Sequence, residues 1–237
     1  MSQPVWGVQG YGRDASSLVD RRSRFIVRTY NHLFGAIVAF IAIEFALFTS
    51  GAAAAIARVT LSGNWLLVLV PFMLVSYLAS RFAYSSPSRG AQYAGLAAYV
   101  VAEALIFVPI LFIAERVAPG AIQSAGIVTM LGFAGLTGVA FVTKKDFSFL
   151  RGVVLYGSIV AIIAVVAGAI FGFQLGTFFS VAMVGLAGAA ILYDTSNVLH
   201  RFPEDRYVAA ALQLFASVAL MFWYVLRIVM SLSNSRN

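Results

Sequence analysis

The sequence predicts an all-α polytopic membrane protein, a bundle of seven transmembrane helices. Of its 237 residues, 61% are hydrophobic and only 11% are charged, whereas a soluble domain has about a quarter of its residues charged. The mean hydropathy is +0.91. From Leu33 onward, apolar stretches long enough to cross ~30 Å of hydrocarbon alternate with short polar breaks. Apolar surface this abundant must be buried, which excludes a disordered chain as well as a soluble one.

The predicted elements begin after a polar segment, residues 1–31. This segment holds five arginines and no apolar stretch of the length of a secretory signal, so we expect an uncleaved cytoplasmic tail. Residues 32–237 are expected to form the transmembrane domain. Its seven spans are predicted at residues 33–57, 64–80, 91–114, 121–143, 150–171, 176–197 and 208–231. The weakest break is at Gln174, but merging its two neighbours would give a helix of about 48 residues, too long for one crossing.

The basic residues predict the orientation. If the N-terminus is cytoplasmic, twelve of the 16 Lys and Arg residues lie on that side and four on the other. Because cytoplasmic loops carry the excess of Lys and Arg, we expect the N-terminus in the cytoplasm and the C-terminus outside a bacterial inner membrane. The formal net charge of +7 then reflects the orientation of the protein in the membrane and not a nucleic-acid partner. We therefore expect the lipid bilayer as a partner and no nucleic acid.

The side-chain inventory argues against an enzyme. The chain has no cysteine and only two histidines, which excludes disulfides, thiolate metal sites and cysteine nucleophiles and disfavours a zinc site. His32 and His200 fall at span ends, so no histidine is available as a base for a serine inside the bundle. No phosphate-binding loop of the Walker type is present. We expect no catalytic residue and no cofactor.

Two acids lie inside predicted spans. Glu44 is about eleven residues into span one and Glu103 about twelve into span three, so at 1.5 Å per residue each would lie some 17 Å deep, close to the bilayer midplane. A carboxylate there costs roughly 2.5–3.5 kcal/mol on insertion scales. One interpretation is a relay in which the two acids pass a cation or a proton. The other is that each is protonated or hydrogen-bonded and only stabilises helix packing.

Asp194 lies in the most polar run inside any span, with Asn197 on the same helical face. On span seven, Gln213, Ser217 and Tyr224 form one stripe. The short loop between the two spans predicts antiparallel packing, so the two polar faces should meet in the cytoplasmic half. They would line an ion pathway or supply interhelical hydrogen bonds of about 0.6 kcal/mol each. A neutral Asn would supply such bonds without an ionisation penalty, which favours the pathway.

Three sequence features carry a resemblance to a known family: TKKDFSFLRG at residues 143–152, ILYDTSN at residues 191–197, and Pro109 on span three. With seven spans, they resemble the Bax inhibitor-1 family, also called the transmembrane Bax-inhibitor-motif proteins. The run from Asp194 to His200 is similar to its bacterial YccA-like branch. The resemblance implies a central span wrapped by the other six in two triplets, and a cytoplasmic N-terminus.

The resemblance also implies two functions. Members of the calcium-leak type carry two aspartates that share a proton and gate a pore with pH. Asp194 matches the first, but the second falls on Ser217, which cannot ionise, so that latch cannot form in the same way. Arg81 matches the arginine that pairs with these aspartates.

Members of the YccA branch instead bind a membrane-bound FtsH-type ATP-dependent protease and restrain it. Two hypotheses therefore stay open. The first is a pH-sensitive calcium, cation or proton leak, or stress modulator, in the cytoplasmic membrane. The second is a non-conducting protein that modulates such a protease. The residues expected on the ion pathway or in pH sensing are Asp194, Ser217, Glu44, Glu103, Arg81, Asn197 and Gln213.

Overall fold

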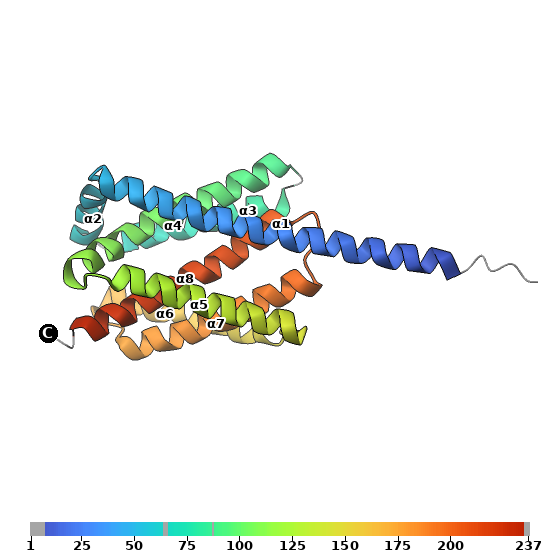
Figure 1. Cartoon of the computed structure of the whole chain (residues 1–237). Coiled ribbons are helices and arrows are strands. Elements are labelled where there is room, and N and C mark those ends of the chain that lie inside the picture. Colours follow the sequence, from blue (N-terminus) through green and yellow to red (C-terminus); the bar gives the residue numbers. More distant parts are fainter. Residues whose placement is uncertain (1–7, 64–65, 87, 235–237) are drawn as a thin grey trace, which may run out of the picture.

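The computed structural model describes residues 8–63, 66–86 and 88–234, which fold into a bundle of helices without a strand in that part of the chain (Figure 1). Seven of the helices are long and apolar enough to cross a membrane. This confirms the predicted all-α, seven-span fold class. The helices are α1 (Val8–Thr49), α2 (Ala52–Ser62), α3 (Leu66–Ser85), α4 (Arg89–Val117), α5 (Ala121–Thr143), α6 (Leu150–Phe171), α7 (Thr177–His200) and α8 (Tyr207–Asn234).

Most predicted boundaries agree with these helices, but the first span differs at both ends, since α1 already begins at Val8. The predicted spans 121–143 and 150–171 coincide with α5 and α6. The break at Gln174 is confirmed, because Gly172 ends α6 with a positive φ of 74°. The first span, predicted at 33–57, is wrong at its end. Gly51, with φ at 78°, separates α1 from the short α2, and the apolar residues on both sides of this turn hide it from a hydropathy pattern.

Helix α8 occupies the centre of the bundle. It contacts α1, α3, α4, α5 and α7, and its span is the most deeply buried of the seven. Leu214 and Leu226 on it are fully buried. By contrast, α6 packs mainly on α7 and keeps most of its surface outside the bundle. The polar residues of α8 therefore lie inside the protein, where each needs a partner.

Helix α1 is continuous from Val8 and projects beyond the rest of the bundle at its N-terminal end (Figure 1). Phe25 and Thr29 are already buried, so packing begins before residue 31. That residues 1–31 lie in the cytoplasm stays a prediction, and residues 1–7 are outside the described part of the chain.

Glycine permits one close helix contact. A Cβ atom on Gly95 of α4 would lie 2.6 Å from the carbonyl oxygen of Ala79 and 3.0 Å from the nitrogen of Ala83, both on α3. Such distances are far below van der Waals contact, so the two helices can approach this closely only around a residue without a side chain. This contact fixes α3 beside α4.

The connections that carry basic residues share one end of the bundle (Figure 1). Arg206 Nη1, between α7 and α8, donates a hydrogen bond to the carbonyl oxygen of Ser86 after α3 over 2.6 Å. Arg201 Nη2 lies 2.7 Å from Asp146 Oδ2, between α5 and α6. The grouping behind the orientation prediction is thus physically present, and the side of the membrane on which it lies stays a prediction.

Candidate functional site

The polar site is centred on Asp194, six residues before the end of α7. Its side chain is only 3% exposed. Gln213 Nε2 donates a hydrogen bond to Oδ1, and Ser217 Oγ donates to Oδ2 over 2.5 Å. The structure therefore brings together Asp194, Gln213 and Ser217, as the two helical stripes predict. Tyr224 lies elsewhere on α8, with its ring edge-on to Phe179.

A third helix orients the glutamine. The Tyr84 hydroxyl on α3 donates a hydrogen bond to Gln213 Oε1 over 2.5 Å. With its oxygen held by this donor, the amide presents its NH₂ group to Asp194. An unbroken chain of hydrogen bonds thus runs from α3 through α8 to α7, and it fixes the carboxyl group in one position.

Three hydroxyl groups lie beside this network. Tyr30 on α1 interacts with Thr137 on α5 and Thr195 on α7, and it is within the electrostatic influence of Asp194. All three hydroxyl oxygens are buried, and none completes a hydrogen bond in the described part of the structure. Buried polar atoms are normally paired, so these three hydroxyl groups add a second polar cluster next to Asp194.

Two residues expected at the site, Arg81 and Asn197, do not bind the Asp194 carboxyl group through their side chains. The ion pairs within the described residues join Arg21 to Glu204, Arg201 to Asp146 and Arg206 to Asp205. The expected pairing of Arg81 with Asp194 is therefore wrong: the Asp194 oxygens are held by neutral donors, and Arg81 is exposed. Asn197 is buried, and its main-chain carbonyl accepts hydrogen bonds from the Arg22 side chain and from the main-chain amides of Arg201 and Phe202.

The three buried acids occupy different levels of the bundle. Glu103 is central in α4 and interacts with Tyr99 one turn earlier. Glu44 lies within two turns of the end of α1 at Thr49, at the end of the bundle opposite Asp194; its depth in the bilayer stays a prediction. Neither Glu44 oxygen has a hydrogen-bond partner among the described residues, so Glu44 and Glu103 do not form a pair. Nor does the described chain gather three potential metal-ligating side chains at one point.

The two sequence segments that carry the resemblance meet at the end of α7. The Phe147 amide donates a hydrogen bond to Ser196 Oγ over 2.9 Å. Asp146 accepts from Arg201 and from the Ser148 amide. These two donors hold the pKa of the Asp146 carboxyl, which lies in the connection between α5 and α6, below its ordinary value. The contacts tie this connection to the helix that carries Asp194.

The end of α7 is also held by α1. Arg22 donates hydrogen bonds to three main-chain carbonyl oxygens there: those of Leu199, Phe202 and Asn197. The Phe25 ring stacks on Phe202. Because the last carbonyls of a helix lack partners within the helix, a guanidinium group satisfies them well.

Sequence reasoning missed Tyr84, Tyr30, Thr137 and Arg22. All four lie on α1, α3 or α5, remote in sequence from α7 and α8, where a helical-face argument gives no pairing. Tyr30 and Arg22 were placed in the tail. A signal was available, because the apolar residues Phe25, Ile26 and Leu33 recur with helical spacing and predict a packed face starting before residue 31.

Comparison with known proteins gives the family. The sequence pattern described as "Inhibitor of apoptosis-promoting Bax1" matches residues 22–235. An uncharacterized protein of Pseudomonas aeruginosa is 36% identical over 45% of this chain and 48% of its own length. Bax inhibitor 1 of Schizosaccharomyces pombe is 33% identical over 49% and 44%, respectively. The modulator of FtsH protease YccA of Escherichia coli is 31% identical over 43% and 46%.

The aligned regions span about half the length of these curated relatives, whereas the family pattern covers almost the whole chain. It begins at Arg22, the residue that holds the end of α7, and it includes Asp194 and both polar stripes. The seven apolar helices and this match agree: the chain belongs to the Bax inhibitor family of multi-pass membrane proteins.

Proposed function

We propose that the protein is a gated cation leak of the inner membrane, passing protons or calcium, with Asp194 as the gate. The observation that carries the proposal is the environment of this carboxyl group. It is buried, it accepts from one amide and one hydroxyl, and it forms no ion pair with any described residue. A buried carboxylate without a positive partner is strongly disfavoured, so a proton or a cation is the missing component.

The buried hydroxyls support the same proposal. Tyr30, Thr137 and Thr195 bring three buried oxygen atoms together, and Tyr30 is within the electrostatic influence of Asp194. Oxygen is the ligand that calcium prefers, and a row of hydroxyls with water also conducts protons. In this scheme the bonds from Gln213 and Ser217 hold the site closed, and loading of the carboxyl group by a proton or cation loosens them.

The proposal is tested with purified protein in liposomes that contain a calcium dye or a pH dye. We expect Asp194→Asn to reduce flux about tenfold or more, because the amide cannot bind a proton or neutralise a cation. Asp205→Asn is the matched control, since Asp205 is exposed in the connection before α8 and pairs with its neighbour Arg206. Wild-type flux from Asp194→Asn, or no flux from any form between about pH 5 and 8, overturns the proposal.

A second candidate is that the chain conducts nothing and modulates a membrane-bound FtsH-type protease, with a role in stress response. The relative named as a modulator of FtsH protease supports it, as does the N-terminal part of α1, which projects beyond the bundle and offers a surface for a partner (Figure 1). We propose further that the N-terminus is cytoplasmic and the C-terminus external, which reporter fusions at the two ends test.

A pull-down from native membranes tests the protease candidate. The structure sets the truncation: deleting residues 1–18 leaves the buried Phe25 and Thr29 and the contacts of Arg22 in place, whereas deleting residues 1–31 removes them. We expect the full chain to recover protease subunits and the shortened chain to recover fewer. If Asp194→Asn keeps full recovery, the two candidate functions are separable. No recovery by the full chain counts against this candidate.

A further inference from the structure

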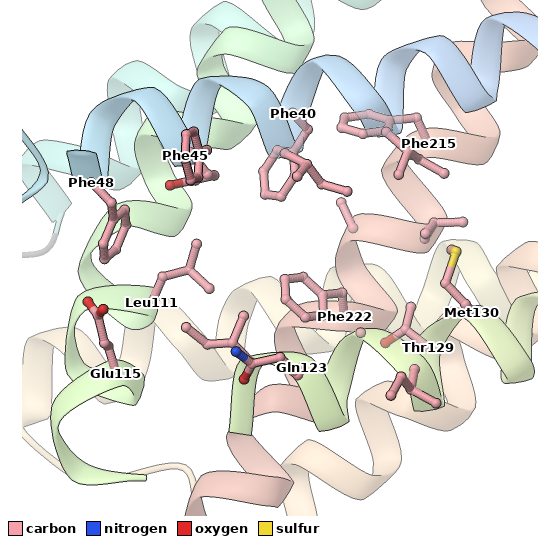
Figure 2. A pocket seen from close by; sticks show the side chains of 18 of the residues that line it. Phe40, Phe45, Phe48, Leu111, Glu115, Gln123, Thr129, Met130, Phe215 and Phe222 are labelled. Carbon is pink, nitrogen blue, oxygen red and sulfur yellow. The ribbon is translucent and has the colours of Figure 1, made fainter. Parts of the chain in front are cut away.

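A groove of about 980 Å³ opens between α1 and α5, and α4 and α8 form its floor (Figure 2). Its wall is mostly aromatic and aliphatic: Phe40 and Phe48 line it from α1, and Phe222 from α8 (Figure 2). Asp194 and its hydrogen-bond partners are not among the residues that line it. The volume is within the range of about 300–1,000 Å³ that is typical of small-molecule sites.

The apolar wall contains two polar groups that lack partners. Glu44 is 7% exposed and Thr129 is 2% exposed, and both line the groove. Neither carboxyl oxygen of Glu44, nor the hydroxyl oxygen of Thr129, has a hydrogen-bond partner among the described residues. Leaving such groups unpaired away from water costs free energy on the order of 1–3 kcal/mol each, so a ligand that pairs with them would gain that amount.

The charge of the lining selects the head group of that ligand. Among the residues that the structure describes, Glu44 and Glu115 are the charged ones that line the groove, and no basic residue lines it. Fatty-acid carboxylates and phosphate-bearing head groups are therefore repelled, whereas a positively charged nitrogen with N–H donors is attracted. Gln123 adds an amide at the end of the groove near the turn between α4 and α5.

The position of the groove selects the source of the ligand. Ile41 and Phe45 on one rim, and Ile127 and Leu131 on the other, are among the most exposed apolar side chains of the protein. In a membrane-spanning bundle such residues face hydrocarbon. The groove consequently opens sideways to the lipid, and its ligand enters from the bilayer.

We propose that this groove binds a phosphate-free cationic amphiphile from the bilayer, with its ammonium group on Glu44 and its alkyl body against the phenylalanines of α1 and α8. The site is independent of the proposed leak. It uses an acid that lies near the opposite end of the bundle from Asp194 and that no interaction within the described protein satisfies.

The probe for the test is hexadecylamine carrying a diazirine and an alkyne, photo-crosslinked to the full chain in nanodiscs and mapped by peptide mass spectrometry. We expect labelling on α1 and α5, with unlabelled hexadecylamine competing better than hexadecanol and hexadecanol better than hexadecanoate. Glu44→Gln should weaken the competition by the amine about tenfold, the value of one charge-assisted hydrogen bond. Glu103→Gln is the control, because that acid lies outside the groove.

A second pair of variants keeps the test valid if Glu44→Gln does not fold. A Cβ atom on Gly126 of α5, which lines the groove, meets nothing within 4 Å, and neither does one on Gly135 of the same helix, which does not line it. Gly126→Leu should fill the groove and abolish labelling, whereas Gly135→Leu should leave it unchanged. Equal labelling of these two variants, or equal competition by amine and fatty acid, overturns the proposal.

Discussion

Ser217 Oγ donates a hydrogen bond to Asp194 Oδ2 over 2.5 Å, and this bond joins α8 to α7 inside the bundle. By the resemblance described above, members of the calcium-leak type carry a second aspartate at the position of this serine. Asp194 therefore keeps a partner, but no second carboxyl group shares its proton. A pH response of this protein at that site must arise from one acid.

Replacing Ser217 by Ala should destabilise the bundle, because Oδ2 of Asp194 then loses its donor inside the protein. Interhelical hydrogen bonds in membranes contribute about 0.6 kcal/mol on average and about 1.7 at most, and we expect a loss of unfolding free energy in that range. Unfolding in detergent mixtures of increasing SDS content measures it. Ser217→Thr, which keeps the hydroxyl, should remain near the wild type. An alanine variant as stable as the wild type contradicts a bond of this strength.

Replacing Ser217 by Asp should restore a two-acid site and with it a steeper pH dependence. Two carboxyl groups within hydrogen-bond distance titrate as a coupled pair, whereas one alone gives a Hill coefficient of about one. We expect ion flux in liposomes to depend on pH with the higher coefficient in the variant. Asn in place of Ser217 is the control, since it cannot ionise. An unchanged Hill coefficient in the Asp variant would show that an acid at position 217 does not titrate together with Asp194.

Arg22 should stabilise the end of α7 from a distance of some 175 residues along the chain. Arg22→Ala removes donors from three carbonyl oxygens, so we expect faster amide hydrogen exchange in residues 199–206 and a loss of about 1–3 kcal/mol. Arg22→Lys should rescue little of this, because one ammonium group cannot reproduce a planar fork of donors. Arg24→Ala, at an exposed position on the same helix, should leave exchange in this segment unchanged.

Local pattern was sufficient where polar residues or a Pro-Gly pair interrupt the apolar run. The limits of α5 follow from Pro119-Gly120 and the Lys144-Lys145 pair, and the break predicted at Gln174 lies just after Gly172, at which α6 ends. The break at Gly51 was missed because apolar residues continue across it, so hydropathy alone cannot distinguish a turn within lipid from a longer helix.

The candidate site also contains residues that local pattern predicts and residues that only helix packing places. Asp194, Gln213 and Ser217 were predictable because a short connection forces α7 and α8 to pack antiparallel, so two helical stripes have only one way to meet. Tyr84 and Tyr30 reach the site from α3 and α1, and their places depend on packing angles that no sequence period encodes. The expected Arg81 pairing came from resemblance alone. In the structure, neutral donors occupy both Asp194 oxygens.

The ion pair between Asp146 and Arg201 predicts an acid-sensitive connection between α5 and α7. Arg201 and the Ser148 amide lower the pKa of Asp146 from its ordinary 3.8. A carboxyl group whose pKa is lower in the folded state stabilises the protein above its unfolded pKa and loses this effect as the pH falls through its folded pKa. Asp146→Asn should therefore reduce Tm at neutral pH, and its Tm should converge with that of the wild type below pH 3.8.

Arg201→Gln removes the other half of this ion pair and should show the same convergence. A difference between the wild type and Asp146→Asn that persists unchanged into strong acid would assign the effect to the hydrogen bonds of the side chain and not to its charge. Tm is read by differential scanning fluorimetry in one detergent, because exchange of detergent shifts Tm by itself.

Gly95 should be intolerant of even one added methyl group. In Gly95→Ala the new Cβ would lie 2.6 Å from the carbonyl oxygen of Ala79, and backbone atoms cannot move aside as a flexible side chain can. Helices α3 and α4 must then separate, at a cost of about 1–3 kcal/mol for an overpacked contact. SDS unfolding measures the loss.

Gly135→Ala is the matched control, because its Cβ meets nothing within 4 Å. Alanine also favours the helix by up to about 1 kcal/mol, so this variant should be as stable as the wild type or slightly more. If both variants unfold alike, the close approach of α3 and α4 at Gly95 does not hold this part of the bundle together, and Tyr84 must be held beside Gln213 by other contacts of α3.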